Sequence, residues 1–109
     1  MNWNEINKLT PKVIGSIDVD SGCIWIGDPS YVIHKQLPSE IIGSDWDTFT
    51  DLLGNDVYTS FSHKSGNEGL GICTSTKYGD GTYQVIGFFE NHSPKPSFII
   101  IDFVGWFTE

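Results

Sequence analysis

The expected fold follows first from residues 70–89, which read LGICTSTKYGDGTYQVIGFF. The two halves of this stretch, 70–76 and 82–89, are rich in β-branched and aromatic residues, as strands are. Residues 77–81 separate them with two glycines around an aspartate, and glycine adopts the positive φ that tight hairpin turns require. We therefore expect residues 70–89 to form a β-hairpin.

Two strands are also expected upstream of this stretch. Every second residue from Val13 to Val19 is apolar or glycine, so positions 13, 15, 17 and 19 are expected to share one face, and this period of two predicts a strand over 12–19. Asp-Ser-Gly at 20–22 is a turn signal, and CIWI at 23–26 predicts a second strand. We expect these two strands to pair as a hairpin.

Strands at 57–62 and 97–104 complete the expected set. The second of them carries apolar residues on both faces, from Phe98 to Val104. This pattern is typical of a central strand, or of a strand whose second face is buried by a partner. Residues 1–11 are expected to form a short helix or a docked arm.

One amphipathic helix is expected over residues 45–53. Ser44 is placed to cap its first free amides, and Gly54 is placed to end it. Trp46, Phe49 and Leu53 follow at helical spacing. Together the elements predict an α+β fold, mainly an antiparallel β-sheet built of hairpins with one or two short helices, in a single domain over 1–109.

The charge balance restricts the partners. The chain has 109 residues, six lysines, no arginine and fourteen acidic residues, for a net charge of −8. Binding of duplex nucleic acid needs a cationic face, and base readout often uses a guanidinium fork, so duplex nucleic acid is not an expected partner. Anionic membrane surfaces are disfavoured for the same reason.

The chain is expected to be soluble and cytoplasmic. No apolar run approaches the roughly 20 residues of a membrane span, and the first residues lack the pattern of a signal peptide. Cys23 and Cys73 lie in apolar segments and are expected to be buried free thiols, with a disulfide or a reactive thiol as the alternative. No Cys/His cluster indicates zinc, and no cofactor is expected.

The first candidate site follows the strand at 23–26. GDP at 27–29 interrupts the ladder because proline has no N–H to donate, and 31–33 is expected to resume an extended path. The carboxylate at the strand end either closes a turn, with the neighbouring aromatic residues in the core, or faces a ligand. The candidate ligand-binding residues of this segment are Trp25, Asp28, Tyr31, His34 and Lys35.

The second candidate site is the loop around Asp80. The two flanking glycines allow backbone amides to form a nest for an anion, to which Lys77 adds a positive charge. Tyr78 and Tyr83 add flat apolar surface. The alternative is an ordinary hairpin turn with flanking tyrosines. The loop is not a P-loop, because the GxxxxGK[ST] spacing is absent.

No catalytic set is expected from the remaining polar residues. Asp18 and Asp20 begin a segment like the opening of a calcium loop, but the following glycine comes too early, so a turn is favoured. The three histidines form no HExxH motif, and no serine stands in a nucleophile elbow. We therefore predict no catalytic residue and no metal ligand.

Four blocks of the sequence resemble a family of small uncharacterised bacterial and phage proteins. The blocks are VDSG at 19–22, WIGDPSY at 25–31, GLGICTST at 69–76 and YGDGTYQV at 78–85. The family pattern reads VDSG…WIGDPCY and GxGVCxSTxYGDGxYPV. Ser30 stands where it has cysteine, which weighs against a cysteine enzyme, and Gln84 stands where it has proline. The resemblance implies no established activity.

The favoured hypothesis is a non-enzymatic, homo-oligomeric protein that binds a nucleotide-like small molecule. The lysine-only basic set suits a phage with an AT-rich genome, and such a protein would sequester a nucleotide-derived, cyclic dinucleotide-like immune signal in the host cytoplasm. Bases stack on Trp and Tyr, while lysines and backbone amides hold phosphates. One alternative is an acidic inhibitor that docks on a basic protein. Another is a metal-assisted hydrolase that uses Asp28 and Asp80.

Overall fold

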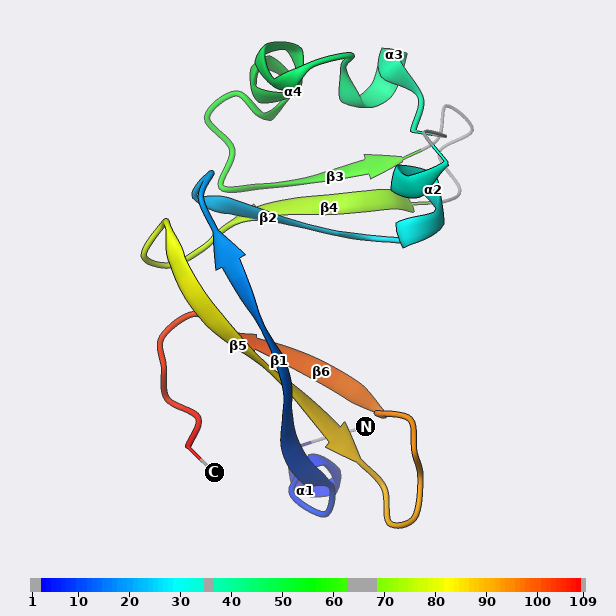
Figure 1. Cartoon of the computed structure of the whole chain (residues 1–109), viewed down its shortest axis with the longest axis vertical. Helices are drawn as coiled ribbons and strands as arrows, with labels where there is room; N and C mark the ends of the chain where they lie inside the picture. The colour runs from blue at the N-terminus through cyan, green and yellow to red at the C-terminus, as the bar shows by residue number, and fades with distance from the viewer. Residues whose placement is uncertain (1–2, 35–36, 63–68, 109) are drawn as a thin grey trace. The chain divides into compact units, whose positions relative to one another are not determined.

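The computed structural model describes residues 3–34, 37–62 and 69–108. They form two compact units, each with a three-stranded antiparallel sheet (Figure 1). Unit 1 comprises Met1–Gly22 and Thr76–Glu109, and unit 2 comprises Cys23–Ser75. Unit 2 is therefore inserted, in sequence, between the two halves of unit 1. None of the helices in the described ranges is long and apolar enough to cross a membrane.

Unit 1 is built on a sheet with the strand order β1-β5-β6. Its elements are the short helix α1 (Trp3–Ile6) and the strands β1 (Thr10–Val19), β5 (Gly81–Phe89) and β6 (Phe98–Asp102). The long strand β5 lies in the middle and pairs antiparallel with both neighbours. The expectation of a short helix near the N-terminus is confirmed.

A bulge in β1 changes which side chains share a face. Val13 lies opposite Ile86, whereas Gly15 lies opposite Val85, so Ile14 is an extra residue between them. Because neighbouring residues of β5 point to opposite faces, Val13 and Gly15 also lie on opposite faces. The expectation that positions 13, 15, 17 and 19 share one face is wrong at Val13, because period-two counting does not detect a bulge.

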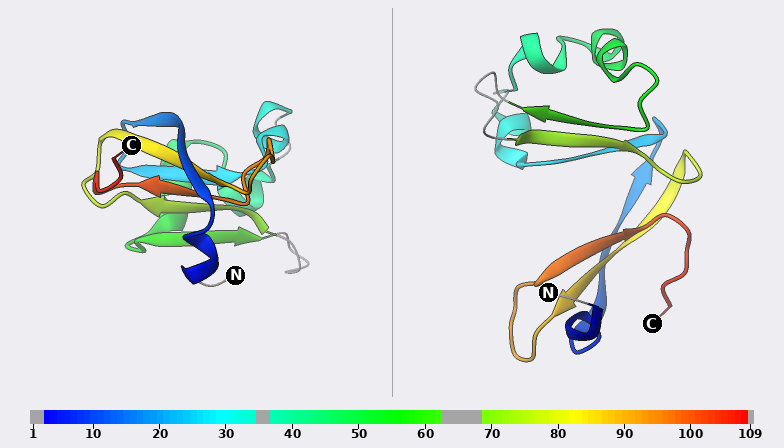
Figure 2. Two further views of the ribbon diagram at one scale, coloured as in Figure 1. Left: turned by 90° about the horizontal axis from the view of Figure 1, so that it is seen from below. Right: turned by 180° about the vertical axis from the view of Figure 1, so that it is seen from behind.

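Unit 2 is built on a sheet with the strand order β2-β4-β3. Its strands are β2 (Cys23–Gly27), β3 (Tyr58–Ser62) and β4 (Gly69–Ser75), and its helices are α2 (Pro29–Ile33), α3 (Ser39–Ile42) and α4 (Trp46–Leu53). The helices α3 and α4 lie over one face of this sheet (Figure 2). The α+β fold with mainly antiparallel sheets is confirmed, with four short helices rather than one or two. The single-domain expectation stays a prediction.

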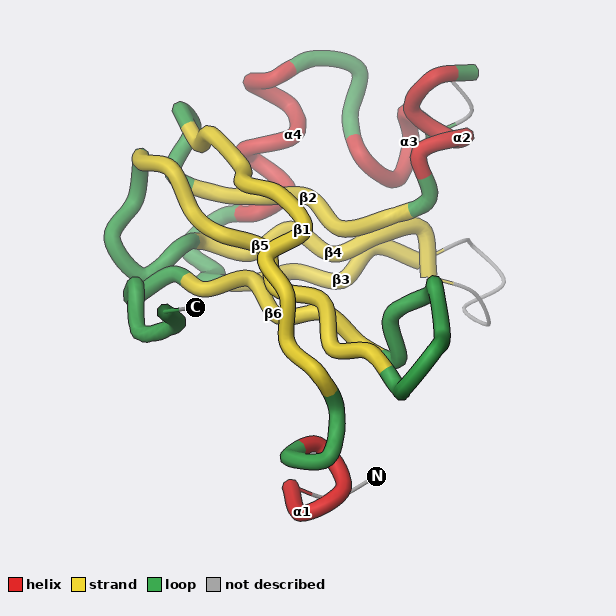
Figure 3. The backbone as a smooth tube through the Cα atoms, turned by 60° about the horizontal axis from the view of Figure 1, so that its bottom comes forward, coloured by secondary structure: helices red, strands yellow, loops and turns green. Residues whose placement is uncertain are grey.

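Both turn-based hairpin predictions are wrong. β1 pairs with β5, and β2 pairs with β4, so 12–19 and 23–26 are not partners. Likewise β4 belongs to the sheet of unit 2 and β5 to that of unit 1, so residues 70–89 are not a hairpin. Residues 20–22 and 77–81 have the chemistry of tight turns, but each connects strands of different sheets (Figure 3).

The helix α4 agrees with the amphipathic pattern at 45–53, but its cap is not the one expected. Asp45 rather than Ser44 is the N-cap, and its carboxylate accepts from the Thr48 backbone N–H at 2.8 Å. The Thr48 hydroxyl oxygen accepts in turn from the Asp45 N–H, which completes a capping box. These bonds hold the pKa of Asp45 below its ordinary value, the Thr48 backbone bond being the main cause. Gly54 ends the helix with a positive φ, as expected.

The core of unit 2 forms where the helices meet the sheet. Phe61, Leu70 and Cys73 are buried, and the helix residues Phe49 and Leu53 pack against them. The Trp25 ring lies beside the Phe49 and Phe61 rings, at centroid distances of 6.2 and 5.7 Å. An added Cβ at Gly71 would overlap the Trp25 ring. Glycine at position 71 therefore leaves the space that this ring occupies.

Candidate ligand-binding site

The first group of expected site residues lies in unit 2, and two of its members pack on the core. Trp25 and Tyr31 are half-buried against the cluster of Phe61, Leu70 and Cys73. Their packing matches the alternative in which both aromatic residues belong to the core. His34 is exposed at the C-terminal end of α2, and Lys35 lies outside the described residues.

Asp28 caps a helix that was not expected. The Ser30 backbone N–H donates to Asp28 Oδ1 at 2.9 Å, and Pro29 occupies the first helical position, where a missing N–H costs nothing. The bond from Ser30 holds the pKa of Asp28 below its ordinary value. The prediction of an extended path at 31–33 is wrong, because these residues belong to α2.

The second group of expected site residues lies in unit 1, where Tyr83 supports the Gly-Asp-Gly loop through a hydrogen bond. Tyr83 is buried, and its hydroxyl donates to the Gly79 carbonyl at 2.7 Å. The Thr76 hydroxyl donates to the same carbonyl. Lys77, Tyr78 and Asp80 are exposed on the loop. Tyr83 is thus a support of the loop, whereas the other three side chains are open to solvent.

Three acidic residues of unit 1 lie close together at one end of its sheet. Asp18, Asp20 and Asp80 line a cavity of about 470 Å³. The Thr82 hydroxyl donates to Asp18 Oδ1 at 2.7 Å. Among the described residues, no group of three or more Asp, Glu, His or Cys side chains is arranged to hold a metal ion. The structure therefore places Asp80 near two other aspartates, but it shows no set of metal ligands among the described residues.

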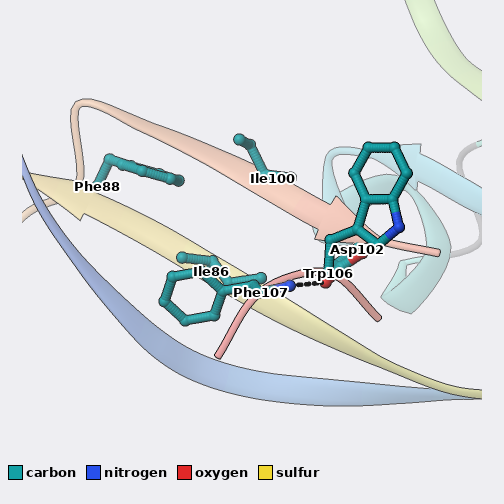
Figure 4. Close-up of a pocket in the computed structure, with 6 residues that line it drawn as sticks. All are labelled: Ile86, Phe88, Ile100, Asp102, Trp106 and Phe107. Atoms are coloured by element: carbon teal, nitrogen blue, oxygen red, sulfur yellow. Dashed lines mark hydrogen bonds between the residues drawn. The ribbon is translucent and has the colours of Figure 1, made fainter. Parts of the chain in front are cut away.

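A different cavity of unit 1 combines apolar walls with one carboxylate. It has a volume of about 320 Å³, close to the lower limit of typical small-molecule pockets. Ile86 of β5 and Ile100 of β6 lie opposite each other in the sheet and share this face. Figure 4 shows the six residues that line it: Ile86, Phe88, Ile100, Asp102, Trp106 and Phe107.

The C-terminal segment completes this cavity because Asp102 holds it in place. Asp102 Oδ1 accepts from the Val104 and Gly105 N–H groups, at 3.1 and 2.9 Å. Its Oδ2 accepts from the Phe107 N–H at 2.8 Å. Gly105 has a φ of +74°, which favours glycine where the chain turns back. These bonds end β6 at residue 102, two residues before the predicted end of the strand.

Trp106 and Phe107 extend from this segment in opposite directions (Figure 4). Phe107 is half-buried, whereas 86% of Trp106 is exposed. Phe88 and Phe98 stack on the same face of the sheet, with centroids 4.6 Å apart and planes 8° from parallel. An exposed indole at the mouth of an aromatic-lined cavity offers a flat surface on which another ring can stack.

None of the six cavity residues was among the expected site residues. Four of them lie on strands, and the three apolar residues among these match the pattern of core residues; the other two follow the predicted strand at 97–104. One signal was present in the sequence: Asp102 is followed by Phe, Val, Gly, Trp and Phe, and aspartate favours turns in which its side chain accepts backbone N–H groups. Two aromatic residues after such a turn indicate a segment that folds back onto the sheet.

The carboxylate of Asp102 makes the order of this segment depend on pH. The Phe107 N–H is the main cause that holds the pKa of Asp102 below its ordinary value, although partial desolvation opposes the shift. The bonds therefore stabilise the folded segment fully above the unfolded pKa, which is about 3.9, and are lost as pH falls through the lower folded pKa.

The Phe107 amide signal in nuclear magnetic resonance (NMR) spectra is accordingly expected to titrate with a midpoint below about 3.9. In the variant Asp102→Asn, this titration should disappear, because the amide does not ionise. A Phe107 midpoint at or above 3.9, or an unchanged titration in the variant, would show that Asp102 does not hold the segment.

Both cysteines are free thiols, as expected, but only Cys73 is buried, and Cys23 is half-buried. Burial, together with a hydrogen bond to Cys23, raises the pKa of Cys73 to about 12. A thiol with this pKa is un-ionised at neutral pH, and the thiolate is the nucleophilic form. The Cys73 side chain thus behaves as a core residue.

Comparisons with known proteins give no relative for this chain. No protein-family model matches it. No curated protein and no solved structure matches it either.

Proposed function

We propose that the protein binds a small molecule with a flat aromatic ring, of the kind found in nucleotide-derived signals, and does not convert it chemically. The cavity that Trp106 helps to line carries this proposal, because its lining is aromatic and aliphatic apart from a single carboxylate, that of Asp102. Nucleobases combine a flat apolar face with polar edges, and aromatic side chains bind them by stacking.

The charge of the cavity favours one orientation of such a ligand. Asp102 is the only charged residue that lines it, so the phosphates of a nucleotide would point away from the cavity and its base would enter. A purine or cytosine amino group would be the natural donor toward the carboxylate, because an ionised carboxylate accepts hydrogen bonds and donates none.

We propose that the ligand is not converted because the pKa of Asp102 is lowered. A general base for neutral pH needs a pKa raised toward 7. The backbone N–H groups instead lower the pKa of Asp102, and three of them bind its oxygens directly. This carboxylate is suited to hold a segment and accept a hydrogen bond, and it is a poor base.

The biological role that we propose is sequestration of a nucleotide-derived immune signal by a phage protein in the host cell. Calorimetric titration tests its chemistry with adenosine and guanosine monophosphates, cyclic di-AMP and cyclic di-GMP. Ribose 5-phosphate is the matched control, since it has the sugar and phosphate but no base. At least one base-containing ligand should bind, while ribose 5-phosphate should not.

The ligand should also be recovered unchanged after the complex is denatured. Conversion of the ligand would replace the proposal by the enzymatic alternative. Equal binding of ribose 5-phosphate would show that phosphate, not the base, is recognised. Failure of all four nucleotides to bind would remove the nucleotide class.

A further inference from the structure

β6 is an edge strand that lacks the features by which proteins protect their edges. It lies at the end of the order β1-β5-β6, and β5 is its only partner strand within the described residues. Of the two alternatives expected for this strand, the central position is wrong, because apolar residues on both faces do not require two neighbouring strands, whereas burial of the second face by a partner stays a prediction. An exposed edge presents unpaired N–H and C=O groups, which another extended strand satisfies.

The opposite edge of the same sheet, formed by β1, carries features that hinder pairing with a further strand. β1 carries Pro11, Lys12 and the bulge at Ile14, and each of these features hinders pairing with a further strand. β6 reads FIIID, with no proline or lysine, and its pairing with β5 is regular over all five residues. Its one charged residue, Asp102, stands at the last position.

Apolar side chains of β6 are open on both faces of the sheet. Ile99 is 50% exposed, and Ile100, which points to the opposite face, is 38% exposed. An edge strand that is apolar on both faces gains burial on both sides when a second apolar strand is added.

We propose that β6 pairs antiparallel with β6 of a second copy of this chain. An apolar edge strand is satisfied by another apolar strand, and β6 itself supplies one. A two-fold axis at Ile100 pairs all five residues and sets isoleucine against isoleucine at the three central positions. In this register Ile100 meets the same residue of the second copy, Ile99 meets Ile101, and Phe98 meets Asp102. Any other antiparallel register leaves part of β6 unpaired.

This register also keeps the two Asp102 carboxylates apart, so their like charges do not oppose the pairing. The two Asp102 residues lie at opposite ends of the paired strands, about 13 Å apart at roughly 3.3 Å per residue. That separation exceeds the Debye length of about 8 Å at physiological ionic strength. The remaining strand residues carry no charge.

Sedimentation equilibrium of the full chain tests the pairing. We expect a mass twice the 12.2 kDa of one chain, and a single-chain mass for Ile99→Lys. Ile26→Lys is the matched control, because Ile26 is an isoleucine of similar exposure on β2 of the other sheet. It should remain a dimer. A monomeric wild-type chain, or a dimer unaffected by Ile99→Lys, would overturn the proposal.

Cross-linking provides a second readout that does not depend on a disruptive variant. The opposed Cα atoms of antiparallel strands are about 4.5–5.5 Å apart, within the range that a disulfide spans. Ile100→Cys should therefore form a covalent dimer on mild oxidation, whereas Ile14→Cys, on the opposite edge, should not. Cross-linking through Ile14→Cys alone would place the contact on β1 and refute the proposal.

Discussion

Replacing Trp106 by alanine is expected to weaken the binding of a base-containing ligand by at least about tenfold. Stacking of a base on an aromatic side chain is worth about 1–3 kcal/mol, and 1.4 kcal/mol corresponds to a factor of ten. With 86% of its surface exposed, Trp106 makes few contacts that folding depends on. Calorimetric titration of Trp106→Ala therefore measures the lost stacking surface rather than a loss of structure.

Trp46→Ala is the matched control for this variant. Trp46 is also an exposed tryptophan, but it lies on α4 of unit 2, where its ring packs on the ring of Phe49. Its removal should leave the dissociation constant unchanged. Equal binding by wild-type and Trp106→Ala chains would show that the cavity of unit 1 does not recognise the base.

Replacing Gly71 by alanine is expected to lower the free energy of unfolding by about 1–3 kcal/mol, the usual cost of an overpacked core. The added Cβ would overlap the Trp25 ring and lie 2.6 Å from Cε2 and 2.8 Å from Cη2. The ring has little room to move, because the Phe49 and Phe61 rings flank it. Denaturation in urea, followed by circular dichroism, measures the loss.

Gly69→Ala provides the control in the same strand. An added Cβ at Gly69 meets no atom within 4 Å, and this glycine has no positive φ. The variant should have the stability of the wild-type chain or slightly exceed it, because alanine restricts the unfolded chain more than glycine does. Equal destabilisation by both substitutions would indicate a general effect of strand glycines instead of a close approach to Trp25.

The sequence predicted most elements but not their partners. The strands at 12–19, 57–62 and 82–89 and the helix at 45–53 could be predicted because each has a local pattern of apolar residues with the period of its element. Pairing depends on contacts between segments far apart in sequence, and a turn signal does not report them. Gly22 and Gly79 both have the positive φ expected of tight turns, yet the chain passes from one sheet to another at each place.

The candidate site was missed for a related reason. Ile86, Ile100 and Phe107 come from two strands and a returning segment, and no local motif links them. The two motifs expected to form sites contain residues with structural roles, since Asp28 caps α2 and the Tyr83 hydroxyl donates to the carbonyl of Gly79 in the Gly-Asp-Gly loop. Whether Lys77, Tyr78 and Asp80 contact a ligand stays a prediction.

Binding in the cavity is tested most sharply by a titration of the isotope-labelled protein, followed by NMR, with the tightest ligand of the nucleotide panel. We expect the signals of the Trp106 indole N–H and of the Ile100 and Phe107 amides to shift together and saturate, while the Trp46 indole signal does not move. The signals of the ligand should persist unaltered over the same hours. Shifts confined to unit 2, or the appearance of product signals, would contradict the proposal.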